Sequence, residues 1–316
     1  MRRFVIILLS VVFLAGCAGH VAGSKKAESR EFPSVKAPDF ITDKVERADY
    51  ITEHFWEGFF SGNGPTDTGK VLGVVNSDIE KNVIIYLGYL DFLPMSKAQD
   101  RIKGLFNQIE STHARDTTAH VYQLMTALLS MYLYDPNSPL RSEDLYLPFV
   151  EGMAASQYTT PQARPGYVFQ EQKCRLNQFG QKAPDFKFKD LRGAVHSLYG
   201  IKAGYTLLFF SNPGCQNCLE IINELKSQGD IDARIEAGSL AIVNIYIDEE
   251  LEKWKAYAPN YPVNWHNGYD PSGIIRSDEL YYVRAIPSLY LLDADKRVIL
   301  KDAPIERVLA VIENSN

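Results

Sequence analysis

The stretch Tyr-Thr-Leu-Leu-Phe-Phe-Ser-Asn-Pro-Gly-Cys-Gln-Asn-Cys, residues 205–218, decides the fold of this chain. Residues 205–210 form a continuous apolar run of strand length, and a helical pattern over residues 215–228 follows it. Two cysteines, Cys215 and Cys218, stand at the start of that helical pattern. The stretch therefore predicts a buried strand that leads directly into a helix with a cysteine pair at its N-terminus.

The surrounding segments extend this strand and helix into a mixed α/β domain. Strand patterns are found at residues 183–190, 240–247, 288–292 and 297–300. Helical patterns cover residues 249–257 and 304–312, and Pro304 suits the first turn of the second helix. A strand, a helix and another strand in this order predict a parallel connection, and the last two strands read as a hairpin.

The first half of the chain shows a different pattern. Apolar residues recur at three- and four-residue steps within residues 83–93 and 121–132, which is typical of helices. Ser96 is expected to cap a helix that runs to Ile109, and prolines at 136 and 139 separate two further helices. We expect about six helices and no strand over residues 42–178.

The N-terminus has the features of an export signal. A basic start, Met1-Arg2-Arg3, precedes an apolar run over residues 4–13 that is too short to span a bilayer. The following Leu-Ala-Gly-Cys, residues 14–17, resembles the lipobox of bacterial lipoproteins, which implies lipidation at Cys17. An ordinary secretory leader is the alternative. Ala18 in place of Asp favours the outer membrane, facing the periplasm.

Composition narrows the classes of function. The net charge is −6, and it becomes −8 if Arg2 and Arg3 leave with the leader, so no basic surface for nucleic acid is expected. With Cys17 assigned to lipid, three cysteines remain, too few for a disulfide-stapled scaffold. No histidine stands at ligand spacing from the pair, so no metal site is predicted. A close cysteine pair in an exported chain indicates redox chemistry.

The position of the pair explains how it would react. Unpaired N–H groups and the helix dipole stabilise negative charge at a helix N-terminus, which favours a thiolate at Cys215. Cys218 lies one turn further, less exposed, and can resolve a mixed disulfide. Half a zinc site and a static disulfide are the alternatives for an isolated pair of this kind.

Pro287 stands directly before the predicted strand 288–292. A cis bond between Ile286 and Pro287 would present the backbone of Ile286 to an incoming peptide or thiol. A trans proline that begins the strand is the alternative. We predict that Ile286, Gln216 and Asn217 shape the substrate groove.

The chain from Ala183 onward resembles the thioredoxin-like family, specifically the exported thiol–disulfide oxidoreductases that also resemble peroxiredoxins. The matching residues are Ala-Pro-Asp-Phe at 183–186, the strand at 207–210, Cys-Gln-Asn-Cys at 215–218, Ala-Ile-Pro-Ser at 285–288 and Leu-Leu-Asp at 291–293. The resemblance implies a mixed sheet flanked by helices, a cis bond at Pro287, Cys215 as nucleophile and Cys218 as resolving thiol. It implies no metal or organic cofactor.

The chain departs from the family pattern at the dithiol. Asn-Pro-Gly at 212–214 replaces the Trp-containing approach that is common before the first cysteine, and Gln216-Asn217 replaces a frequent Gly-Pro or X-Pro pair. Ile221 stands where many reducing relatives carry a buried Glu. These differences leave the direction of electron transfer open.

The helical half resembles a domain that precedes thioredoxin-like domains in Bacteroidetes lipoproteins. The resemblance lies in Tyr-Ile-Thr-Glu-His-Phe-Trp-Glu-Gly-Phe, residues 50–59. We therefore predict a signal peptide over residues 1–16, a tether over 17–39, an all-α domain over 40–178 and a thioredoxin-like domain over 179–316.

These features together predict a membrane-tethered thiol–disulfide oxidoreductase. Its partners would be exported proteins or small thiols and disulfides, a redox partner, and a membrane reached through the lipid anchor. A peroxiredoxin is the first rival, but it needs Thr or Ser three residues and Pro seven residues before its cysteine, where Cys215 has Asn212 and Leu208. A binding lipoprotein with a structural disulfide is the second rival.

Cys174 precedes the predicted redox domain. We expect a free, partly buried cysteine. A mixed disulfide with Cys215, or a role as an additional resolving thiol, is the alternative.

Overall fold

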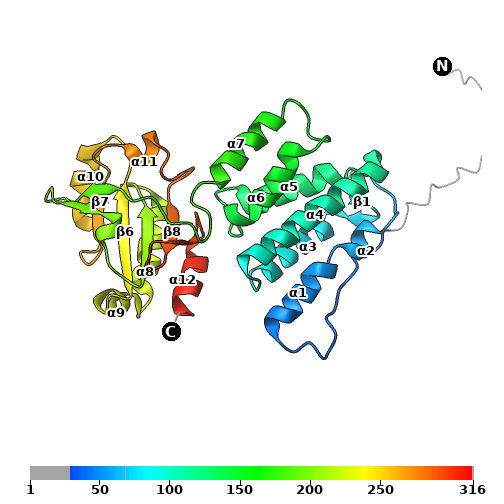
Figure 1. Ribbon diagram of the computed structural model, residues 1–316, viewed down its shortest axis with the longest axis horizontal. Coiled ribbons are helices and arrows are strands. Elements are labelled where there is room, and N and C mark those ends of the chain that lie inside the picture. Colours follow the sequence, from blue (N-terminus) through cyan, green and yellow to red (C-terminus); the bar gives the residue numbers. More distant parts are fainter. Residues whose placement is uncertain (1–28, 68, 315–316) are drawn as a thin grey trace, which may run out of the picture.

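The computed structural model describes residues 29–67 and 69–314, which form a helical part followed by a part built on one large sheet (Figure 1). We call residues 40–178 the helical part and residues 179–314 the sheet part. The predicted signal peptide and the lipidation site Cys17 lie outside the described residues. Within the described ranges, no helix combines the length and the apolar character needed to cross a membrane.

The helical part contains the predicted helices and one short hairpin. Two strands of two residues each form this hairpin, and Leu72 and Gly73 make its turn, where the φ of Gly73 is 81°. The prediction of no strand in this region was therefore wrong. Strands this short leave no periodic signal in a sequence. The elements are α1 (Lys44–His54), α2 (Glu57–Phe60), β1 (Lys70–Val71), β2 (Val74–Val75), α3 (Asn76–Leu90), α4 (Met95–Arg115), α5 (Val121–Tyr134), α6 (Glu143–Ala155) and α7 (Arg164–Cys174).

The N-terminus of α4 differs from the prediction. Pro94 is the N-cap residue, and its carbonyl accepts from the backbone N–H groups of Lys97 and Ala98. Ser96 lies inside the first turn and does not cap the helix, which runs to Arg115 and not to Ile109. The φ of Pro94, −54°, suits the entry to a helix, and the helix has no side-chain cap.

Aromatic side chains build the core of the helical part. Trp56 and Phe59, from the segment that resembles the Bacteroidetes domain, are buried with ring centroids 5.9 Å apart, and Tyr86 of α3 packs 5.5 Å from Trp56. Phe32, in the predicted tether, stacks on Phe59 at 5.6 Å, and Arg30 donates to the Phe59 carbonyl at 2.8 Å. The aromatic pattern at residues 50–59 is therefore a packing pattern.

The sheet part has one mixed sheet in the strand order β4-β3-β7-β6-β5-β8-β9. The predicted parallel connection between β5 and β6 and the antiparallel hairpin of β8 and β9 are confirmed. Two strands, β4 and β7, were not predicted, because neither carries an apolar run. The strands are β3 (Lys187–Lys189), β4 (Val195–Ser197), β5 (Tyr205–Phe210), β6 (Leu240–Tyr246), β7 (His266–Tyr269), β8 (Ser288–Leu292) and β9 (Val298–Leu300).

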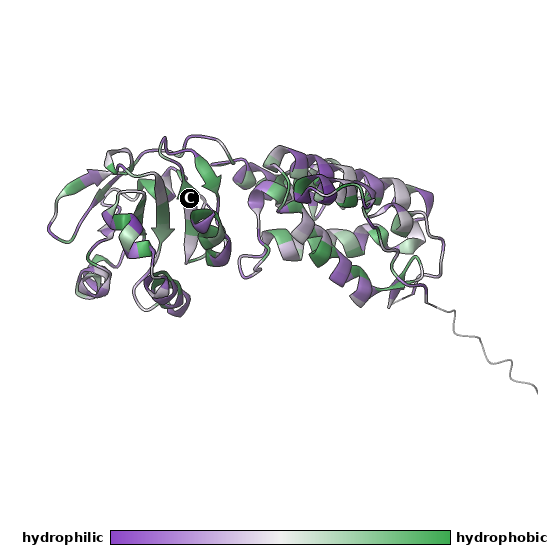
Figure 2. Cartoon of the chain, turned by 90° about the horizontal axis from the view of Figure 1, so that it is seen from below, coloured by the Kyte–Doolittle hydropathy of each residue, from purple (hydrophilic) through white to green (hydrophobic). Residues whose placement is uncertain are grey.

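Helices cover the two faces of the sheet unequally. Leu207 and Phe209 of β5 point to the face packed by α8, α9, α10 and α12, whereas Leu208 and Phe210 point to the face with α11. The central strands β5 and β6 are mostly apolar (Figure 2). The helices are α8 (Gln216–Ser227), α9 (Ile231–Glu236), α10 (Leu251–Tyr257), α11 (Ile274–Ser277) and α12 (Ile305–Glu313).

A buried ion cluster joins the two parts. Glu143, at the start of α6, lies 2.9 Å from the Nε of Arg284 and 2.6 Å from the Nζ of Lys301. Arg284 also pairs with Asp302 at 2.9 Å, and all four side chains are at most 8% exposed. The guanidinium lies 4.1 Å from the ring centroid of Tyr134. Each charge therefore has an opposite charge beside it inside the interface, as buried charges require.

Cys174 is a free and fully buried thiol at the end of α7. Burial raises its pKa far above the ordinary value. The expectation of a free cysteine is confirmed, although the side chain is more deeply buried than we predicted. Lys301, from the ion cluster, donates to its backbone carbonyl at 3.1 Å.

Removing Arg284 should destabilise the protein strongly. Arg284→Ala leaves Asp302 without its cation and weakens the pairing of Glu143, so we expect a loss of about 3 kcal/mol in the free energy of unfolding, measured by urea denaturation. Arg175→Ala, which breaks the ion pairs with Glu151 and Glu171 at a side chain 51% exposed, is the matched control and should cost under about 1 kcal/mol. Equal losses in both variants would contradict this account of the interface.

Cys174 should resist alkylation in the folded protein. We expect the peptide that contains it to react with iodoacetamide at least roughly 100-fold more slowly in buffer than in urea, because thiol reactivity follows thiolate formation and access. Mass mapping of the peptides after timed labelling measures this. Comparable rates in the two conditions would show that the thiol is accessible.

Candidate functional site

The predicted cysteine pair forms a disulfide at the N-terminus of α8. The Cα atoms of Cys215 and Cys218 are 5.2 Å apart. Cys215 is the N-cap residue, and its Sγ accepts from the backbone N–H of Cys218 at 3.1 Å. Cys218 is 2% exposed, whereas Cys215 is half-buried, so the first sulfur is the accessible one, as the sequence predicts.

The helix supplies the electrostatics of this turn. The N-terminus of α8 carries partial positive charge, and one of its N–H groups already points at the Cys215 sulfur. After reduction, that arrangement favours the thiolate of Cys215 over the thiol. Gly214, with a φ of 77°, makes the sharp turn into the helix, and an L side chain would be strained there.

Side-chain hydrogen bonds to neighbouring segments fix residues 211–214, which lead from β5 to the dithiol. Ser211 follows β5 and donates to Asn244 of β6. The side chain of Asn212 donates to Asp248, whose other oxygen pairs with Arg276 at 2.6 Å. Asn212, Asp248 and Arg276 thus hold the Asn-Pro-Gly segment at 212–214, which stands in place of the Trp-containing approach that is common in the family. The sequence alone did not predict these contacts.

Pairing of β5 with β8 brings Pro287 to the dithiol. Phe210, five residues before Cys215, pairs with Ser288, directly after Pro287. The Ile286–Pro287 peptide is cis, as the resemblance implied, and the Ile286 carbonyl oxygen lies 4.0 Å from the Cys215 sulfur. The structure therefore brings Cys215, Cys218, Ile286 and Pro287 together.

The segment that carries Pro287 is fixed at both ends by the buried ion cluster. Arg284 stands three residues before Pro287, and Ser288 donates to Asp302 at 2.8 Å. Asp302 thus contacts residues on both sides of the cis peptide. Sequence reasoning missed Arg284, Asp302 and their partner Glu143, because single charged residues far apart in a sequence give no sign that they meet.

The predicted groove residues separate into two groups. Asn217 and Ile286 line a groove of about 410 Å³ beside the dithiol, together with Pro287. Gln216 is exposed and is not among the residues that line it, and its amide donates to Glu220 at 3.0 Å. Ile221, where many reducing relatives have Glu, lines the groove and packs into the core beneath α8.

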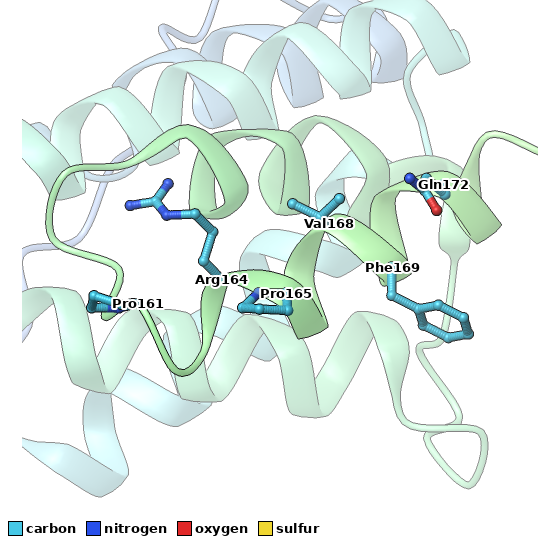
Figure 3. A pocket seen from close by; sticks show the side chains of 6 residues that line it. All are labelled: Pro161, Arg164, Pro165, Val168, Phe169 and Gln172. Carbon is cyan, nitrogen blue, oxygen red and sulfur yellow. The ribbon is translucent and has the colours of Figure 1, made fainter.

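Away from the dithiol, the described residues hold pockets but no cluster of metal ligands. No group of three or more His, Cys, Asp or Glu side chains in the described ranges is placed to hold a metal ion. A pocket of about 460 Å³ lies along α7, where Val168 and Phe169 contribute apolar surface (Figure 3). Arg164 in that pocket donates to the carbonyls of Ser156 and Thr159, so its charge is engaged in the fold.

Known proteins are similar to each of the two parts of this chain. The model of a family described as a domain of unknown function (DUF5106) matches residues 18–170. A solved thioredoxin-like protein from Bacteroides caccae ATCC 43185 has a TM-score of 0.74 and 33% identity, covering 91% of this chain and 99% of that chain. The solved C-terminal domain of an uncharacterized protein from Bacteroides fragilis NCTC 9343 is 42% identical, covering 43% of this chain and 98% of that chain, with a TM-score of 0.42.

A curated relative is also described as thioredoxin-like. Thioredoxin-like protein YneN from Bacillus subtilis (strain 168) is 34% identical over 125 residues, which are 39% of this chain and 69% of that protein. The Bacteroides caccae structure aligns over both the helical and the sheet part. The Bacillus subtilis relative, the Bacteroides caccae structure and the dithiol at the start of α8 agree with one another. The chain therefore belongs to the thioredoxin-like proteins.

Proposed function

We propose that the protein is a thiol–disulfide oxidoreductase that reacts through Cys215 and Cys218. The observation that carries this proposal is the half-buried Cys215 sulfur, which faces a helix N–H on one side and the Ile286 carbonyl on the other. A substrate strand beside Ile286 could pair with its backbone while its sulfur meets Cys215.

Reduction of a substrate would proceed in two exchanges. The Cys215 thiolate attacks one sulfur of the substrate disulfide, so a bond forms between Cys215 and that sulfur while the other substrate sulfur leaves as a thiolate. Cys218 then gives its proton to the released substrate thiolate and attacks the Cys215 sulfur, so the bond between Cys215 and the substrate breaks and the second substrate sulfur leaves as a thiolate while the Cys215–Cys218 disulfide forms. Two electrons pass from the dithiol to the substrate.

The reverse sequence oxidises a substrate dithiol. Either direction needs an external partner to restore the starting state: a dithiol reductant for reduction, or a disulfide oxidant for oxidation. The buried position of Cys218 supports its role as resolving thiol, because it can reach the Cys215 sulfur within one helical turn and is shielded from other substrates.

We further infer from the leader sequence that a lipid on Cys17 anchors the protein in the cell envelope, with the outer membrane, facing the periplasm, as the expected site. A lipid anchor holds a protein at a membrane without a spanning helix. Its substrates would then be exported proteins or small thiols and disulfides that reach the same compartment.

Replacement of the resolving thiol tests the proposal. Cys218→Ser should accumulate a mixed disulfide through Cys215, because the second exchange is removed and the first is kept. Non-reducing electrophoresis and mass spectrometry of the trapped species measure this, and Cys174→Ser is the matched control, which should trap nothing.

Catalysis of disulfide reduction provides a second test of the same proposal. Unaltered protein should accelerate insulin reduction by dithiothreitol, and Cys215→Ser should abolish that acceleration. Absence of both trapping and insulin reduction would reject the oxidoreductase function and support a structural disulfide.

A further inference from the structure

The groove beside the dithiol has walls from both parts of the protein. In the sheet part it is lined by residues of α8, of the segment that carries Pro287, and of the beginning of α12. In the helical part it is lined by the loop between α5 and α6, through Pro136, Asn137, Pro139 and Arg141. Its volume of about 410 Å³ lies within the range of ligand sites in proteins.

The groove lies next to the dithiol, although neither cysteine lines it. Asn217, which lines it, stands between the two cysteines, and the carbonyl of Ile286, another lining residue, lies 4.0 Å from the Cys215 sulfur. A substrate whose cysteine meets Cys215 would have its neighbouring residues beside this groove.

The loop from the helical part is held in place before any substrate arrives. Ser138 donates to the carbonyl of Tyr132 at 2.6 Å, and Arg141 donates across the interface to the carbonyls of Asp302 and Ala303 at 2.8 and 3.2 Å. Prolines flank Ser138 on the groove side and restrict the backbone further. Binding against a wall that is already ordered costs less conformational entropy.

The groove carries an excess of negative charge. Glu220 and Glu224 lie one turn apart on α8, and Glu306 lies in the first turn of α12. Burial and the charge of Glu306 raise the pKa of Glu224, which indicates that these two carboxylates act on each other. Arg141 is the one cation among the described residues that line the groove, and its charge, which acts on Glu306, offsets only part of the charge of the three carboxylates.

We propose that the α5–α6 loop is the second wall of the substrate groove, and that the groove selects an extended protein segment with a basic residue close to its reactive cysteine. The inference rests on the proposed function and names its substrate class. Apolar lining residues, including Ile221, Pro287 and Ile305, accept the backbone and apolar side chains of the segment, while the three carboxylates attract its positive charge.

Model peptides measure this preference directly. Three peptides differ only in the residues that flank one cysteine, which are Lys, Gln or Glu, and each cysteine is held in a mixed disulfide with a chromophoric thiol. The reduced full chain is mixed with each peptide, and release of the chromophore gives a second-order rate constant. Dividing each constant by that for dithiothreitol removes the intrinsic reactivity of the peptide.

We expect the Lys-flanked peptide to react about tenfold faster than the Glu-flanked peptide at low salt, with the ratio falling to about twofold at high salt. Replacing Glu220, Glu224 and Glu306 together by Gln should reduce the low-salt ratio to about twofold. The matched control replaces Glu236, Glu252 and Glu313 by Gln, which changes the net charge equally at exposed positions outside the groove, and should keep the ratio.

A single substitution tests the contribution of the helical part. Asn137→Arg places a cation on the loop wall and should slow the Lys-flanked peptide by about fivefold. Asn223→Arg makes the same change on the outside of α8, away from the groove, and should leave the rate within about twofold. Thermal melting of each variant checks that the fold is retained.

The outcomes separate the inference from the function on which it rests. Exchange with all three peptides at equal normalised rates would overturn the charge selection while the oxidoreductase function stands. Equal rates for Asn137→Arg and Asn223→Arg would overturn the role of the loop. Failure of the reduced protein to exchange with any peptide, the Gln-flanked one included, would reject the proposed function itself.

Discussion

Antiparallel pairing between β5 and β8 is the constraint on which the site depends. Cys215 and Pro287 are far apart in the sequence, and they meet because Phe210 and Ser288 are register partners at the ends of these strands. The parallel pairing of β5 with β6 fixes the other side of the same strand, and Ser211 extends it by bonding to Asn244. A one-residue slip in this register would move every side chain of β5 to the opposite face and carry the dithiol away from the cis peptide.

The helical part contacts the site region through buried ion pairs and also forms one wall of the groove beside the dithiol. Glu143 belongs to α6, yet its partners Arg284 and Lys301 stand on either side of the β8–β9 hairpin that follows Pro287. Because replacing such a buried network with apolar residues is often neutral for stability in other proteins, we infer that this network serves to position the segments that it joins. It fixes the α5–α6 loop beside the groove and holds the segment that carries Pro287 from its outer side.

The sequence predicts the local parts of this arrangement and not the contacts between them. The strand at 205–210, the helix after it and the hairpin at 288–300 have clear patterns, because apolar runs and turn residues act over short distances. The roles of the cysteines followed from their place at a predicted helix N-terminus, whereas the cis bond at Pro287 was one of two alternatives until the family resemblance favoured it. The pairing of Asp302 with Arg284 leaves no pattern in the sequence, since a buried ion pair depends on tertiary packing. Strand β7 was not predicted because His-Asn-Gly-Tyr lacks the apolar, β-branched residues typical of strands.

The central claim is that Cys215–Cys218 is a reactive couple and not a structural bond. The most direct measurement is its reduction potential, obtained by equilibrating the full chain in dithiothreitol or glutathione redox buffers and quantifying the dithiol. A redox-active site of this kind should have a potential between about −120 and −270 mV, the range of characterised thiol–disulfide exchange proteins. A value below about −300 mV, typical of structural disulfides, would contradict the account.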